Sequence, residues 1–466
     1  MAGESGGRRM TIERVEAYIE SHRGEFLERL KELIRIPSVS AQPAHNADTR
    51  RAAEFVAADL RRSGLTVEVI ETPGHPLVYA EGPARPGKPT LLVYGHYDVQ
   101  PAEPLEPWLS PPFEPTERDG NLYARGATDD KGQMYTHCKA AEAWTAAGGG
   151  LPLNVKFLIE GEEEFGGANL EAFVAANRPK LACDFAVISD SSQFAPGIPA
   201  ITYGLKGIAY FEMTVRGANR DLHSGTFGGA VANPLNALAT ILASLKGPDG
   251  KVAIEGFYDD VKPLADWERA EFAALPFSDD EFRRDLGVDT LAGEAGYTTL
   301  ERKWARPTCD VHGLYGGYQG PGGKTVLPCF GGAKLSFRLV PDQDPAVIAR
   351  LLRAHVARVA PPGVAVEINE YNSAPAVLVD AQGNKGIEAA RRAVETAFGA
   401  RPILIREGGT IPVVGLIKKE LGVDTLLLGW GQNDDNLHGP NEKFSLDAFY
   451  RGIRASARLF DELSRI

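Results

Sequence analysis

The segment TLLVYGHYD (residues 90–98) joins a short apolar run directly to two side chains that can bind a metal, His96 and Asp98. The run shows no alternation of apolar and polar residues, which is typical of a strand buried on both faces of a sheet. The same pattern, an apolar run followed by acidic or histidine side chains, recurs at three further places: VKFLI (155–159) before a run of glutamates, FAVIS (185–189) before Asp190, and TLLLGW (425–430), which leads through a loop to His438.

Helical patterns lie between these predicted strands, for example over residues 131–147 and 169–176. Alternation of buried strands with helices is typical of an α/β domain, and we expect a doubly wound mixed sheet. An earlier stretch, 12–34, has apolar residues at three- and four-residue spacing and is expected to be helical with a break near Gly24. In open α/β sheets, ligands bind at the carboxyl ends of the strands. The four predicted strands are therefore expected to present their polar ends to one crevice.

The middle of the chain follows a different pattern. From about residue 207, strands such as AKLSFRLV (333–340) and VAVEINEY (364–371) alternate apolar and polar residues and are mixed with helical stretches. That mixture is typical of an α+β domain. We predict an α/β catalytic domain in two parts with an inserted α+β domain: 11–206, then the insertion 207–382, then 383–466.

Composition excludes several classes of function. The net charge of −12 and the pI of about 5.4 argue against a general affinity for nucleic acid, whose phosphates attract Lys and Arg. The four cysteines form no CxxC pair, which indicates free thiols in a reducing compartment, so we expect a cytoplasmic protein. No apolar run approaches the roughly 18 residues that span a bilayer, so we expect no membrane partner. Residues 1–10 are polar, and we expect a disordered leader with folding from Thr11.

Each polar residue near a strand end also has an ordinary structural explanation. Asp129 or Thr128 could cap the helix that follows, or the two oxygens of Asp129 could bridge two cations. The glutamates 162–164 could form a solvated acidic face, or one could bind metal while its neighbour takes a proton from water. Asp190 could cap a turn, and His438 could be a surface histidine.

Taken together, these positions supply two histidines and three carboxylates, enough for two divalent ions that share one bridging group. Asp98 would fix the ring of His96 from behind, as carboxylates often do for metal-bound histidines. Nitrogen and oxygen ligands without thiolate suit Zn²⁺ or Mn²⁺. Two such ions, about 3.5–4 Å apart, activate a water molecule and polarise a carbonyl group.

At these residues the sequence resembles the M20 family of metallopeptidases, in particular the dipeptidase branch that includes carnosinase-like and cytosolic non-specific dipeptidases. The resemblance extends from about Ile12 to the C-terminus. It implies a dipeptidase that cleaves small peptides with a free C-terminal carboxylate. The matching motifs occur in order: GHYDVQP (95–101), YARGATDDKG (123–132), EGEEE (160–164), ISDS (188–191), DLHSG (221–225), SFRLVPD (336–342), REGGTIP (406–412) and HGPNEKF (438–444).

The resemblance implies a ligand role for five residues. One metal would be held by His96 and Asp190, and the other by Glu164 and His438. Asp129 would bridge the two metals. The cofactors implied are therefore two divalent ions per subunit, Zn²⁺ or Mn²⁺.

The resemblance also implies the catalytic residues around the metals. Asp98 would support its neighbouring histidine, and Glu163 would be the general base and then the acid for the leaving amine. A cis peptide bond is implied before Asp130. Glu162 is an additional acid beside the two that the family uses, and this departure from the family's pattern would move the functional pair by one position if Glu162 belonged to it. The spacing from Glu160 favours Glu163 and its successor.

The inserted domain is implied to be a lid that also forms a homodimer. His223 would reach the partner's active site and stabilise the oxyanion, and Thr325 would line the site. Arg338 and the Thr410 loop would hold the substrate carboxylate, since the guanidinium fork pairs with a carboxylate through two hydrogen bonds. Each also has a structural alternative: His223 in a turn, and Arg338 paired with an internal acid.

Two rival functions remain open from the sequence. A related amidohydrolase acting on N-acyl or N-carbamoyl amino acids would use the same metals with a different pocket. A metal-binding protein without catalysis would lack a base or a ligand, whereas every expected position is filled here. The DVQP and DLHSG motifs favour the dipeptidase.

Overall fold

The computed structural model describes residues 2–466, which form two compact units. The first unit extends to Tyr203 and also contains Val379–Ile405 and Leu416–Ile466. The second unit consists of Gly204–Leu378 and Arg406–Gly415. The sequence-based division assigns all of 383–466 to the catalytic domain, whereas the structure groups the short segment 406–415 with the second unit.

Four parallel strands form the centre of the sheet in the first unit, and they are the four strands that the sequence predicts. Their order is β6 (Asn154–Glu160), β3 (Thr90–His96), β7 (Phe185–Ile188) and β17 (Thr425–Leu428). In the pairing of β3 with β6, His96 lies beside Glu160. Because parallel strands point the same way, the polar residues that follow all four strands lie at the same edge of the sheet.

Antiparallel strands flank this parallel centre, so the sheet is mixed, as predicted. β2 (Leu77–Glu81) pairs with β6, β1 (Thr66–Ile70) pairs with β2, and β8 (Ala200–Leu205) pairs with β17. The consecutive residues of β3 from Leu91 to Tyr94 are at most 1% exposed. Since neighbouring residues of a strand point to opposite faces, both faces of this sheet are covered. The predicted α/β class is confirmed.

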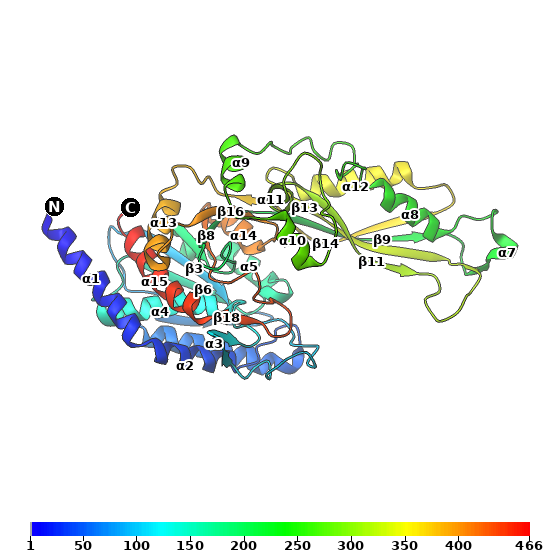
Figure 1. Ribbon diagram of the computed structural model, residues 1–466. Helices are drawn as coiled ribbons and strands as arrows, with labels where there is room; N and C mark the ends of the chain where they lie inside the picture. The colour runs from blue at the N-terminus through cyan, green and yellow to red at the C-terminus, as the bar shows by residue number, and fades with distance from the viewer. Residues whose placement is uncertain (1) are drawn as a thin grey trace. The chain divides into compact units, whose positions relative to one another are not determined.

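The helices of the first unit come from both ends of the chain. α4 (Lys131–Ala147) packs against α15 (Leu446–Leu463), which in turn packs against α13 (Lys385–Phe398) (Figure 1). α4 also contacts β3. The helix that begins at the end of the YARGATDDKG motif is therefore fixed between the central sheet and the C-terminal helix.

The N-terminal segment is helical where disorder is expected. α1 (Ala2–Ser21) is followed by α2 (Arg23–Ile34). The expectation of a disordered leader is therefore wrong from Ala2 onward, and Met1 lies outside the described residues. The segment contains no proline, and extending a helix avoids the cost of nucleating a new one. The break falls at His22, since Gly24 lies inside α2. No helix in the described part of the chain is both long and apolar enough to cross a membrane.

The second unit combines an antiparallel sheet with helices, the predicted α+β arrangement. Its strands follow the order β11 (Thr308–Gly316), β13 (Phe330–Leu339), β9 (Gly207–Arg216) and β14 (Ala365–Ala374). Every second residue of β9 is buried. These residues face a core to which α8 (Pro234–Ser244) and α12 (Pro345–Val359) contribute. A separate ribbon pairs β10 (Leu222–His223) with β12 (Val326–Leu327) and leads into α7 (Ser224–Phe227).

A small three-stranded sheet in the first unit joins two distant motifs. β18 (Lys443–Ser445) pairs with β5 (Asn121–Tyr123), which pairs with β4 (Thr116–Arg118). The pairing places the end of HGPNEKF beside the start of YARGATDDKG. The remaining elements are the 3₁₀ turns Pro43–His45 and Glu163–Phe165, α3 (Asn46–Arg62), α5 (Ala168–Ala176), α6 (Arg178–Leu181), α9 (Asp266–Ala273), α10 (Asp279–Leu286), α11 (Thr299–Ala305), β15 (Val377–Leu378), β16 (Ile403–Glu407) and α14 (Pro412–Leu421).

Candidate functional site

His96 is the last residue of β3, and both it and Asp98 are completely buried. The Nδ1 atom of His96 lies 3.1 Å from the carbonyl oxygen of Asp98 and 3.4 Å from its Oδ1. The other carboxylate oxygen of Asp98 accepts hydrogen bonds from the Ser40 hydroxyl at 2.6 Å and from the backbone N of Glu164 at 3.1 Å. Asp98 therefore holds the imidazole from its Nδ1 side, which leaves Nε2 for another partner.

Asp129 lies in the turn before α4 and faces two histidines. Its Oδ1 is 3.2 Å from His96 Nε2, and its Oδ2 is 2.9 Å from His438 Nε2. The peptide bond between Asp129 and Asp130 is cis, as the resemblance implies. Asp130, rather than Thr128 or Asp129, caps α4, because its side chain accepts a backbone hydrogen bond in the first turn. The carboxylate of Asp129 is therefore free of the capping role.

The five predicted ligands form two groups that share Asp129. Donor atoms of His96, Asp129 and Asp190 lie within 4.8 Å of one another, and so do donor atoms of Asp129, Glu164 and His438. In the second group, His438 Nε2 is 3.4 Å from Glu164 Oε2. The structure thus brings together all five residues, and the residue predicted as the bridge is the one common to both groups.

The three consecutive glutamates after β6 have different environments. Glu162 is buried and accepts hydrogen bonds from the backbone N of His75 at 2.9 Å and from the side-chain amide of Asn169 at 2.8 and 3.0 Å. Both of its oxygens therefore hold the surrounding loops. Glu164 accepts a hydrogen bond from Gln100 Nε2 at 2.9 Å. Glu163, between these two in sequence, is the first residue of the 3₁₀ turn Glu163–Phe165.

Burial and neighbouring charges shift the pKa values of these groups. Burial raises the pKa of Glu163 and of Glu164, and the negative charge of Asp129 raises both further. Burial acts to raise the pKa of Asp129 too, but its hydrogen bond with His438 and the nearby charge of His96 hold it below its usual value. The pKa of His438 is raised, chiefly by its hydrogen bond with Asp129. Such a cluster holds protons that a bound cation displaces.

The side chains present fit divalent metal ions. His96 Nε2 is buried and has no hydrogen-bond partner among the described residues, as expected for a nitrogen placed to bind a metal. Buried carboxylates this close to one another are costly unless cations offset their charge. The donor set has two imidazoles, three carboxylates and no thiolate, a composition of Zn²⁺ and Mn²⁺ sites.

The predicted residues of the second unit form two pairs. His223, on β10, is exposed, and Thr325 directly precedes β12, the partner strand of β10. The residue after His223 donates its backbone N–H to the carbonyl of Thr325 at 3.1 Å. Arg338, on β13, donates from Nη1 to the Thr410 hydroxyl at 2.9 Å, and this hydroxyl donates to the carbonyl of Lys206 at 2.6 Å. Arg338 and Thr410 are thus held together by a hydrogen bond.

Two residues that the sequence analysis did not single out connect the ligands of the first unit. Arg125 and Glu442 are buried and form an ion pair, with Nη1 of the arginine 2.8 Å from Oε2 of the glutamate. Glu442 also accepts a hydrogen bond from the backbone N of Asp129 at 3.1 Å, and Arg125 donates to the carbonyl of His438 at 2.9 Å. Both lie inside motifs that contain predicted ligands, which was the only signal for them in the sequence.

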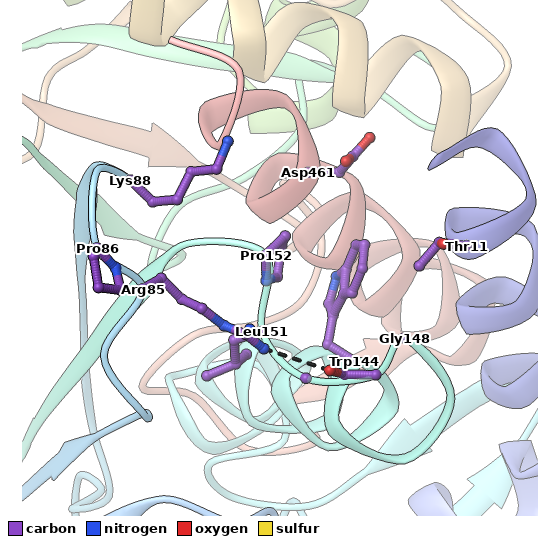
Figure 2. A pocket seen from close by; sticks show the side chains of 11 residues that line it. Thr11, Arg85, Pro86, Lys88, Trp144, Gly148, Leu151, Pro152 and Asp461 are labelled. Atoms are coloured by element: carbon purple, nitrogen blue, oxygen red, sulfur yellow. Dashed lines mark hydrogen bonds between the residues drawn. The ribbon is translucent and has the colours of Figure 1, made fainter. Parts of the chain in front are cut away.

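A cavity of about 520 Å³ elsewhere in the first unit has a different chemistry (Figure 2). Arg85 and Lys88 lie along it, and Arg85 donates a long hydrogen bond of 3.5 Å to the carbonyl of Gly149. Its lining contains one carboxylate, Asp461, and no histidine. This cavity lacks a set of metal ligands, so we assign the chemistry to the strand-end cluster.

The chain is similar over nearly its whole length to known peptidases. Peptidase family M20/M25/M40 matches residues 92–462. The Cys-Gly metallodipeptidase of Schizosaccharomyces pombe is 32% identical over 98% of this chain and 99% of its own length. The Beta-Ala-His dipeptidase of Rattus norvegicus is 33% identical over 98% of this chain and 96% of its own length. The crystal structure of human carnosine dipeptidase 1 has a TM-score of 0.85 and 33% identity, covering 98% of this chain and 99% of that one.

Proposed function

The chain belongs to peptidase family M20/M25/M40, which confirms the resemblance of its motifs, and from this premise we propose that it is a metal-dependent dipeptidase. It hydrolyses the peptide bond of dipeptides that have a free C-terminal carboxylate. The observation that carries this proposal is the pair of ligand groups that share Asp129. Two divalent ions bound there would activate a water molecule and polarise the scissile carbonyl.

Each proposed ligand comes from a different strand end or loop. His96 and Asp190 would hold one ion, Glu164 and His438 would hold the other, and Asp129 would supply an oxygen to each. The support is that the two oxygens of Asp129 face different histidines, at 3.2 and 2.9 Å. The nitrogen and oxygen donors favour Zn²⁺ or Mn²⁺ as the native ions.

Glu163 is the proposed general base, and Asp98 positions His96. Burial raises the pKa of Glu163 toward the range in which a carboxylate accepts and returns a proton near neutral pH. Glu163 takes a proton from the attacking water and delivers it to the leaving amine. Its neighbour Glu162 is unsuited to this role because both of its oxygens are engaged with His75 and a side-chain amide.

Substrate recognition is assigned to the second unit. Arg338 binds the C-terminal carboxylate of the substrate through its guanidinium fork. The Thr410 hydroxyl, which accepts a hydrogen bond from Arg338, keeps the fork oriented. Thr325 lines the substrate site beside the ribbon that carries His223.

We also propose that the protein is a homodimer through the second unit. His223 is exposed on a short ribbon, where it can reach the active site of a partner subunit and stabilise the oxyanion. The test mixes His223→Ala chains with Glu163→Gln chains. Hybrid dimers should regain activity, because one active site then has both groups. Verified hybrids that stay inactive would remove the role of His223 in the partner.

The test of the main proposal is hydrolysis of dipeptides, N-acetyl amino acids and N-carbamoyl amino acids by metal-free protein with added Zn²⁺ or Mn²⁺. A chelator serves as the control. We expect metal-dependent cleavage of dipeptides above the other two classes. Preference for acylated or carbamoylated amino acids would assign the chain to the amidohydrolase alternative. Metal binding without any cleavage would support a binding protein without catalysis.

A cytoplasmic location is proposed from thiol chemistry. Cys138, Cys183, Cys309 and Cys329 are all free in the described chain. Free thiols persist in reducing compartments. Fractionation of cells that express the protein tests this point, and recovery outside the cytoplasm would contradict it.

A further inference from the structure

Arg125 and Glu442 form an ion pair whose side chains are only 1% and 0% exposed. Burying two charges is costly, and it is offset only when further hydrogen bonds satisfy the remaining polar atoms. The other partners of this pair therefore identify the groups that it holds in place. They come from three separate segments of the first unit.

The carboxylate of Glu442 accepts hydrogen bonds from the backbone of the turn that carries Asp129. Its Oε2 accepts hydrogen bonds from Arg125 and from the backbone N of Gly126 at 2.9 Å. Its Oε1 accepts from the backbone N of Thr128 at 3.0 Å and of Asp129 at 3.1 Å. All four bonds need an acceptor, so an ionised carboxylate satisfies them and an amide does not.

The guanidinium of Arg125 fixes the loop that carries His438. Its second terminal nitrogen, Nη2, donates to the carbonyl of His438 at 2.9 Å and to the carbonyl of Pro101 at 3.2 Å. His438 has a φ of +61°, a left-handed conformation that is uncommon for a residue with a side chain. The bond from Arg125 therefore helps to define which way this strained residue presents its imidazole.

We propose that Arg125 and Glu442 are positioning residues that set the placement of His438 relative to Asp129. They thereby determine the affinity of the metal position formed by Asp129, Glu164 and His438. The inference rests on the proposed metal centre and deepens it. The other position depends less on the pair, because His96 ends a central strand and is held by Asp98.

The test replaces Arg125 with lysine, which keeps the charge but has one nitrogen in place of a planar fork. One ammonium group cannot reproduce the bonds of both Nη1 and Nη2. Metal-free protein is titrated with Zn²⁺ in the presence of a competing chelator, and the two binding affinities are fitted separately. We expect the Zn²⁺ affinity of the position formed by Asp129, Glu164 and His438 to fall by roughly 10- to 100-fold, while the affinity of the other position changes far less. Excess Zn²⁺ should restore kcat, because the variant loses occupancy of a metal position but keeps the proposed catalytic residues.

Glu442→Gln provides a second variant if Arg125→Lys does not fold. In this variant an amide NH₂ would face backbone N–H groups and disturb the turn that carries Asp129. Because Asp129 is common to both metal positions, the metal affinities of both should fall. The matched control is Asp59→Asn, which changes a carboxylate that is also buried, at 2% exposure, and paired with Lys139 and Arg29. Asp59, Lys139 and Arg29 are not proposed metal ligands. The control should lower Tm and leave both metal affinities unchanged.

The possible outcomes separate this inference from the proposed function. A folded Arg125→Lys protein with both affinities at their wild-type values would overturn the positioning role. Equal weakening in Asp59→Asn would also overturn it, because the effect would then follow from lost stability. Wild-type protein that binds fewer than two ions would instead refute the metal centre itself.

Discussion

Two groups of candidate residues differ in how the fold holds them. In the first unit, His96 and Asp98 are completely buried, at and just after the end of a strand of the central sheet. In the second unit, His223 is exposed on a two-residue strand, and among the described residues its Nδ1 bonds only to Thr226, within its own turn. Groups on rigid elements are placed more accurately than groups on short exposed segments. The first group therefore has its candidate metal ligands fixed within one chain, whereas the proposed role of His223 in a partner subunit depends on the homodimer that we propose.

The largest expected effect is the loss of the base in the buried group. Glu163→Gln should lower kcat by about 10²- to 10⁴-fold, the usual contribution of general base catalysis. Both metal ions should stay bound, because Glu163 is not a proposed ligand. Steady-state kinetics together with metal analysis measures the two effects. Near-normal turnover would remove Glu163 from the mechanism.

The neighbouring acid provides the control for that experiment. Glu162→Gln breaks the hydrogen bonds to His75 and Asn169 and should lower Tm. Its kcat should fall far less than that of Glu163→Gln. If Glu162→Gln lowered kcat more than Glu163→Gln did, the functional pair would be Glu162 and Glu163 instead.

The next largest effect concerns the exposed group. His223→Ala should lower kcat by roughly 10²- to 10³-fold, as loss of an oxyanion donor does. Tm and metal content should not change, because the side chain is exposed. Thr226→Ala is the matched control, since it removes a side-chain contact of His223 and keeps the imidazole. Full activity of His223→Ala would show that this ribbon has no part in catalysis.

A smaller effect is expected for Arg338. Arg338→Ala should weaken binding of substrates with a free C-terminus by about 1.5–3 kcal/mol, the range for hydrogen bonds to charged groups. C-terminally amidated substrates should lose little. Thr410→Val, which removes only the hydroxyl that orients the guanidinium, should have a milder effect on KM. Equal losses on free and amidated substrates would contradict recognition of the carboxylate.

The smallest effect is the pH dependence of metal binding. The hydrogen bond with Asp129 raises the pKa of His438, so the proton is bound below that raised pKa. A metal needs the neutral imidazole and must displace this proton. Metal affinity should therefore rise with pH, by about tenfold per unit for each proton displaced. Metal titration calorimetry across the neutral and alkaline range measures this slope, and a flat profile would contradict the assignment of His438.

The parts of the site that the sequence reveals are those with a local pattern. The strand ends at His96, Asp190 and the glutamates are recognisable because an apolar run directly precedes ligand-type residues. The role of Arg125 was not predictable in this way. Its partner Glu442 is 317 residues away in the chain, and the two segments are brought together by the pairing of β5 with β18.

Two further differences have the same origin. Polar composition suggested disorder for residues 1–10. These residues from Ala2 onward belong to α1, whose later turns extend toward the N-terminus without a new nucleation step, and composition alone does not show this. The segment 406–415 lies in sequence between two segments of the first unit, Val379–Ile405 and Leu416–Ile466. Its membership in the second unit depends on contacts such as the hydrogen bond of Thr410 with Arg338, which no local pattern shows.

The central claim is that the strand ends of the first unit hold two metal ions through one shared carboxylate. The most direct measurement is anomalous diffraction from crystals of the protein grown with Zn²⁺ or Mn²⁺. The account predicts two peaks about 3.5–4 Å apart on either side of Asp129, one next to His96 and the other next to His438. A single peak, or peaks bound by other residues, would contradict it.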